Sequence, residues 1–134
     1  MVRLMVYIIL LSNQMNIVLM TLGLSTSWLF MYKIEWLLNH KSFLFYIVYS
    51  LLLFFLSKMG EGNWPSHEVI LVALQMPFYS AIIFKTLQLL FQSIFKRNPV
   101  NTFWTFTSYP VQDVVFSMMF WILGTGIPVY LTIN

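Results

Sequence analysis

Residues 43–57 read FLFYIVYSLLLFFLS, and this charge-free stretch lies between Lys41 and Lys58. Its centre, residues 51–56, is entirely apolar. A transmembrane helix needs about 20 residues to cross the hydrocarbon core of a bilayer. Because the charge-free stretch is shorter than that, we expect its helix to begin near residue 38, which predicts a membrane span over about 38–57.

Charged residues separate similar apolar stretches along the rest of the chain. No charge lies between Arg3 and Lys33, and this stretch would be about 43 Å long as a helix, more than the roughly 30 Å thickness of the hydrocarbon core. A cluster of polar residues at 12–16 divides it. The first span is therefore predicted at about 13–32, with residues 1–12 outside it or against a partner.

Two further spans are predicted in the second half of the chain. The Gly- and Pro-containing loop 58–68 precedes a span at about 69–90, in which Pro77 predicts a kink. Pro110 suits the first position of a helix, and it precedes a span at about 111–132. The sequence thus predicts an all-α polytopic membrane protein with about four transmembrane helices, short loops and a single membrane domain over 1–134.

The amino-acid composition also indicates a membrane protein. Hydrophobic residues make up 60% of the chain and charged residues 8%, against about 25% charged residues in ordinary soluble domains. So few charges cannot cover the surface of a water-soluble domain, and they also exclude a disordered tail and a basic nucleic-acid binder. The chain has no cysteine, which excludes disulfides and thiolate metal sites.

The positions of the basic residues predict an orientation. Loops 33–42 and 96–110 carry most of the Lys and Arg residues, and such loops remain on the cytoplasmic side of a membrane. We therefore expect both loops on the cytoplasmic or matrix side of a bacterial cytoplasmic membrane or an organellar inner membrane.

Three ionisable residues near span ends are candidates for an intramembrane ion pair or polar site: Lys85, Asp113 and Arg97. An ionisable residue within a span is a functional-site hypothesis, but Lys85 is close enough to one membrane surface for its long side chain to reach the headgroups. Asp113 follows Pro110 by three residues, where free N–H groups of a helix favour a carboxylate. It could instead carry a proton or cation, or pair with Arg97 or Lys85.

Amides and small residues in the first and last spans predict helix contacts. Asn13 and Asn16 suit hydrogen bonds between helices or a polar path. Thr21 and Ser25, and likewise Gly23 and Ser27, are spaced four apart, a spacing of small residues that lets helix backbones approach closely. Gly124 and Gly126 are the corresponding packing candidates in the last span.

No residue pattern predicts catalytic chemistry, a cofactor or a metal. His40 and His67 fall in predicted loops on opposite sides of the membrane, and no H-x-x-x-H, H-E-x-x-H or E-x-x-H spacing occurs. The nucleophile motif G-x-S-x-G is also missing. We therefore expect the protein not to be an enzyme.

These observations favour a non-catalytic accessory or structural subunit of a larger membrane protein complex, with the lipid bilayer and other membrane subunits as partners. The alternative is a small homo-oligomeric transporter or channel for ions or small molecules, with Lys85, Asp113, Asn13 and Asn16 as its polar lining. A third hypothesis is a regulatory protein that binds one partner transiently through residues 1–12.

Overall fold

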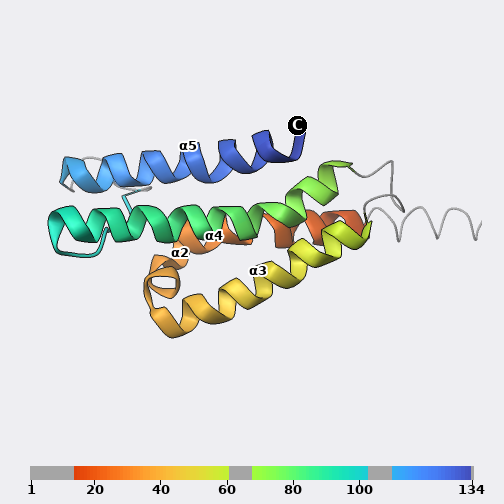
Figure 1. The fold of residues 1–134 in the computed structure, drawn as a ribbon, viewed down its shortest axis with the longest axis horizontal. Helices are drawn as coiled ribbons and strands as arrows, with labels where there is room; N and C mark the ends of the chain where they lie inside the picture. The colour runs from red at the N-terminus through yellow and green to blue at the C-terminus, as the bar shows by residue number, and fades with distance from the viewer. Residues whose placement is uncertain (1–13, 61–67, 103–109, 134) are drawn as a thin grey trace, which may run out of the picture.

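The computed structural model describes residues 14–60, 68–102 and 110–133, and these residues form helices joined by short connections (Figure 1). The helices are Gln14–Gly23, α2 (Ser25–Leu38), α3 (His40–Gly60), α4 (Glu68–Phe95) and α5 (Val111–Ile133). No strand occurs in the described part of the chain. The prediction of an all-helical fold is confirmed.

Three helices are long and apolar enough to cross a membrane: His40–Met59, Ile70–Phe95 and Val111–Leu131. A fourth span arises if the Gln14–Gly23 helix and α2, which meet at an angle of 47°, cross the membrane together. The structure therefore supports three to four candidate spans, as predicted from the sequence.

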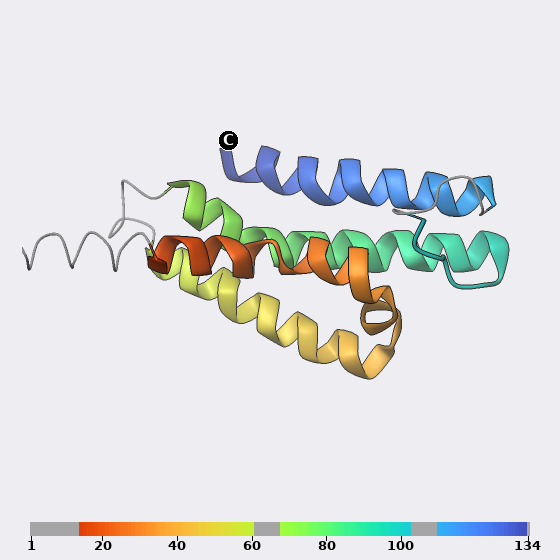
Figure 2. The same cartoon turned by 180° about the vertical axis from the view of Figure 1, so that it is seen from behind.

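The longest helix, α4, is the centre of the molecule. α5 lies along one side of α4 and α3 along the other, while the Gln14–Gly23 helix and α2 pack beside α3 and α4 (Figures 1 and 2). The candidate span in α4 is 61% buried, against 28% for α3 and 24% for α5. α4 is therefore the scaffold against which the other helices are placed.

Aromatic side chains form the core between α2, α4 and α5. Phe30 of α2 is completely buried, with its ring centroid 4.3 Å from that of Phe120 and 6.1 Å from that of Phe84. Phe84 also meets Phe116 edge-on at 6.0 Å. These tilted and edge-to-face arrangements are the favoured geometries of aromatic pairs. The core thus holds the middle of α2 against both long helices.

The first span differs from its prediction in two places. The helix is interrupted at Leu24, and α2 continues beyond residue 32 to Leu38, although Lys33 within it has non-helical dihedral angles (φ −145°, ψ 49°). Residues 33–38 were expected to be part of a loop, and that expectation was wrong. The extra turn forms because it places Leu37 in the core with no exposed surface.

The later helices follow the predicted spans, with small differences at their ends. α3 begins two residues after the predicted start of its span, and α4 continues to Phe95. Pro77 lies inside α4, and the first part of α4 tilts away from the axis of the remainder (Figure 1). This bend is the geometry expected of a proline that lacks the N–H needed by the helix.

Candidate functional site

A cluster of hydrogen-bonded polar side chains lies where α4 ends and α5 begins. Arg97 donates two hydrogen bonds to the carboxylate of Asp113, one to Oδ1 at 3.0 Å and one to Oδ2 at 2.6 Å. The backbone N–H of Val100 donates a third, at 2.8 Å, to Oδ1. The Asp113 side chain is completely buried, whereas that of Arg97 is 41% exposed. A two-point pair of this kind fixes both partners in one orientation.

Helix termination places these two residues together. Lys96 has a positive φ of 55°, which ends α4 and turns the chain toward α5. Asp113 is in the first turn of α5, where its own N–H bonds the carbonyl of Pro110 at 3.0 Å. The hydrogen bonds with Asp113 raise the pKa of Arg97 above its ordinary value, so that Arg97 stays charged. The predicted candidates Arg97 and Asp113 are thus neighbours in the fold.

The rest of this connection is also bonded to α5. Thr102 is buried, and its hydroxyl lies 3.1 Å from the hydroxyl of Ser117 and 3.4 Å from the carbonyl of Asp113. The guanidinium carbon of Arg97 lies 5.1 Å from the centroid of the Phe91 ring. Residues 96–102 therefore attach the end of α4 to the start of α5 through hydrogen bonds, an ion pair and an aromatic ring.

Lys85 lies in α4, three turns before this junction, and is half-buried. Its Nζ donates a hydrogen bond of 3.0 Å to the side-chain oxygen of Gln88 and lies 5.0 Å from the centroid of Phe43. The amides of Gln88 and Gln92 both donate to the side-chain oxygen of Asn98. No carboxylate of the described residues forms an ion pair with Lys85. The structure therefore does not bring Lys85 and Asp113 together.

Asn101 closes the break in α2. Its side-chain Nδ2 donates to the carbonyls of Phe30 and Met31, at 2.8 and 2.9 Å. In a continuous helix these carbonyls would accept from the N–H groups four residues later, across the position where Lys33 is non-helical. The amide of Asn101 thus satisfies carbonyls at the break, and it ties the loop after α4 to α2.

Replacing Asn101 with alanine should lower the free energy of unfolding by about 2 kcal/mol, because the partly buried carbonyls of Phe30 and Met31 lose their hydrogen-bond donor. Equilibrium unfolding of the purified protein in mixed micelles with increasing dodecyl sulfate would measure the loss. Thr86→Ala serves as the control, since the exposed Thr86 hydroxyl donates one hydrogen bond within its own helix, to the carbonyl of Ile82. Equal losses in the two variants would contradict the role assigned to Asn101.

Buried polar side chains within the helices bond to neighbouring helices. Gln75 donates to the hydroxyl of Ser57 at 2.8 Å, and Ser57 donates to the carbonyl of Leu71 at 3.0 Å. Ser80 of α4 donates to the carbonyl of Gly124 in α5 at 2.5 Å. These side chains were not singled out in the sequence, because a serine or glutamine in an apolar stretch does not reveal its partner.

The first helix and α4 approach each other closely at Gly23. A Cβ added there would lie 2.3 Å from the carbonyl oxygen of Ala73 and 2.9 Å from its Cβ. Ala73 lies four residues before Pro77, so its carbonyl lacks the usual helical N–H donor. Only glycine leaves room for this contact between the first helix and α4.

The other predicted packing residues have mixed surroundings. Ser25 is within 3.0 Å of the hydroxyl of Tyr46 in α3, and Gly124 lies beneath the ring of Phe120. Ser27 is half-buried. Thr21 is exposed and donates to the carbonyl of Ile17 in its own helix. Its expected role between helices is not what the structure shows.

Gly126, Asn13 and Asn16 are the remaining residues that the sequence predicted as packing or polar candidates. A Cβ added at Gly126 would have no neighbour within 4 Å, so no described residue packs against this glycine, and its role in packing stays a prediction. The spacing of small residues does not say which of them faces another helix. Asn16 is half-buried in the Gln14–Gly23 helix, and Asn13 lies outside the described residues.

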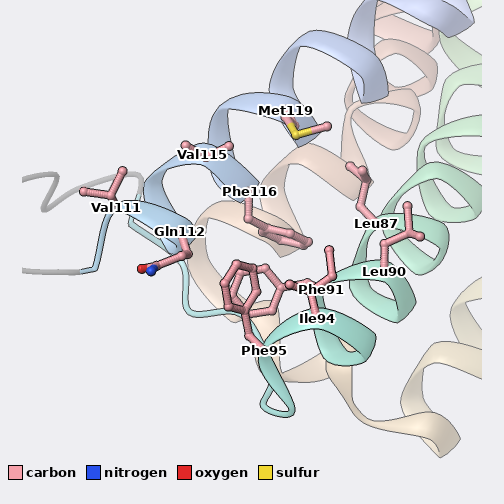
Figure 3. Close-up of a pocket in the computed structure, with 10 residues that line it drawn as sticks. All are labelled: Leu87, Leu90, Phe91, Ile94, Phe95, Val111, Gln112, Val115, Phe116 and Met119. Carbon is pink, nitrogen blue, oxygen red and sulfur yellow. The ribbon is translucent and has the colours of Figure 1, made fainter.

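An apolar groove of about 450 Å³ lies between the adjoining ends of α4 and α5 (Figure 3). We call it the α4–α5 groove. Gln112 is its one polar lining residue, and in Figure 3 its amide points away from the rings of Phe91 and Phe116. The described residues that line it are Leu87, Leu90, Phe91, Ile94, Phe95, Val111, Gln112, Val115, Phe116 and Met119.

Metal-binding groups and similarity to known proteins give no further assignment. Within residues 14–60, 68–102 and 110–133, no three His, Asp or Glu side chains are grouped to hold a metal ion. No protein-family model, curated protein or solved structure matches this chain, so its function is argued from its own residues.

Proposed function

We propose that the protein is a non-catalytic membrane subunit of a larger complex, in which it acts as a structural scaffold. The observation that carries this proposal is that the buried polar side chains form hydrogen bonds and an ion pair within the chain. Asp113 is completely buried and is held by Arg97 and by the N–H of Val100, so its carboxylate is engaged within the chain. A carboxylate that binds and releases an ion or a proton must be reached by the water-filled path through which that ion moves, whereas the Asp113 side chain is completely buried.

The polar groups deeper in the helices support the same proposal. Gln75, Ser57 and Ser80 each bond to a neighbouring side chain or carbonyl across a helix interface. Such bonds join helices, and each contributes about 0.6 kcal/mol on average in one measured membrane protein. These polar groups hold the helices together within one chain.

The outward faces of α3 and α5 are apolar and little covered. Phe45 of α3 is 77% exposed, and Ile122 of α5 is 71% exposed. In a membrane these faces meet lipid or apolar helices of other subunits. A scaffold subunit uses such faces for contact with its partners, while its own polar groups remain internal.

The test is the composition of the native assembly. The tagged chain is extracted from its native membrane in mild detergent and weighed intact by native mass spectrometry. We expect it together with other polypeptides at a fixed ratio, which persists after the complex is purified a second time. A photo-crosslinking residue at Phe45 or Ile122 should then link the chain to one of those polypeptides, whereas the same residue at the buried position Ala81 should not.

The contrary outcome is an assembly that contains only copies of this chain. Ion or solute flux through such an oligomer in liposomes, lost on replacing Lys85 with alanine, would establish the transporter hypothesis in place of the scaffold.

A further inference from the structure

We propose that the α4–α5 groove binds one acyl chain of an anionic phospholipid whose headgroup lies beside Lys96 and Arg97. This site is independent of the scaffold function, since it depends only on residues at the junction of α4 and α5. Its occupant is a component of the bilayer.

The shape and lining of the groove suit a hydrocarbon chain. Its volume of about 450 Å³ lies within the range of about 300–1,000 Å³ that is typical of ligand sites. Apart from Gln112, its lining is apolar or aromatic. A hydrocarbon chain in this groove would bury side chains that are otherwise partly exposed, such as Ile94, which is 69% exposed.

The groove is next to the positive charges. Phe95 lines it, and the following residue, Lys96, is exposed. Arg97 lies over the ring of Phe91, another lining residue, with 5.1 Å between its guanidinium carbon and the ring centroid. Asp113 neutralises Arg97, but no described carboxylate forms an ion pair with Lys96. Lys96, the residue next to the lining residue Phe95, is therefore an exposed positive charge that no described carboxylate neutralises.

The position of the groove in a membrane favours a lipid over a polar ligand. It lies against the last turns of α4 and the first turns of α5, where both candidate spans end. Basic pockets between transmembrane helices at this level bind anionic headgroups, and each nearby Lys or Arg contributes about 1 kcal/mol. The apolar lining of the groove suits the acyl chain of an anionic phospholipid, and the basic residues Lys96 and Arg97 suit its headgroup.

Native mass spectrometry of the delipidated protein in detergent tests the proposal. Phosphatidylglycerol and phosphatidylcholine with identical acyl chains are titrated separately. We expect the first phosphatidylglycerol molecule to bind more tightly than the first phosphatidylcholine. Lys96→Gln should weaken the binding of phosphatidylglycerol about fivefold. Lys41→Gln, at the start of α3 and away from the groove, should leave it unchanged.

A second pair of variants tests the hydrocarbon part. Met119→Trp fills the groove and should remove the tightly bound lipid, whereas Met118→Trp should not, because Met118 is outside the lining. Both methionines are about half exposed, so both variants are expected to fold. Equal binding of the two lipids, or equal effects within either pair of variants, would overturn the proposal. A dimer of this chain that Met119→Trp dissociates would overturn it as well, since a second copy would then occupy the groove.

Discussion

Replacing Arg97 with methionine is expected to destabilise the protein clearly more than replacing the neighbouring Lys96. The substitution leaves the completely buried carboxylate of Asp113 with the N–H of Val100 as its remaining described donor. Removing one partner of a buried ion pair typically costs about 3–5 kcal/mol, because the remaining charge is buried without compensation. The cost here should be smaller than for a fully buried pair, since Arg97 is 41% exposed and part of its interaction is screened.

The neighbouring lysine provides the control. Lys96→Met removes a charge of the same sign one residue earlier, where no described ion pair is lost, and should change the free energy of unfolding by less than about 0.5 kcal/mol. Asp113→Asn should cost less than Arg97→Met, because the exposed guanidinium can be solvated when its partner is removed. Unfolding in mixed micelles measures all three variants. Equal stability of the Arg97 and Lys96 variants would show that the ion pair does not join α4 to α5.

Replacing Gly23 with alanine is expected to cost about 3 kcal/mol, at the upper end of the usual range for overpacking. The added Cβ would lie 2.3 Å from the carbonyl oxygen of Ala73, which belongs to the backbone of α4 and cannot rotate away. The first helix must therefore move off α4, and contacts on both sides of Leu24 are lost with it. Dodecyl sulfate unfolding reports the stability of the variant.

Gly126→Ala is the matched control for this prediction. Gly126 is also in a helix, but a Cβ there would meet no atom within 4 Å. Alanine favours a helix over glycine by about 1 kcal/mol, so this variant should be as stable as the unmodified protein or slightly more stable. A similar loss in both glycine variants would mean that the close contact with Ala73 is not what requires glycine at residue 23.

These two glycines also show how far the sequence alone can lead. Apolar length and loop charges predicted the approximate positions of the long helices, because a span needs about 20 apolar residues to cross a bilayer. Small residues at a spacing of four indicated close packing, but the spacing does not identify the facing helix. The contact of Gly23 with Ala73, and the open surroundings of Gly126, depend on how the helices are placed in three dimensions.

The ion pair between the end of α4 and the start of α5 could be predicted only in part. Arg97 and Asp113 were recognised because charges are rare in this chain and both lie next to the same predicted loop. The contribution of Asn101 could not be predicted, because the charge of Lys33 marked the end of the first span but not the helix that resumes after it, nor the distant amide that meets the break. Leu37, in the part of α2 that follows the break, is buried in a core formed by distant residues.

The length of α4 has a consequence for the lipids around the protein. Its 28 residues extend about 42 Å, roughly 12 Å more than a typical hydrocarbon core. The bend at Pro77 and the polar residues of its last turns shorten the apolar part that a bilayer must match, and any remaining excess would be taken up by tilt. Since α3 and α5 are packed along both sides of α4, the helix cannot tilt without carrying them with it. In a bilayer, α3, α4 and α5 would therefore adjust to membrane thickness together.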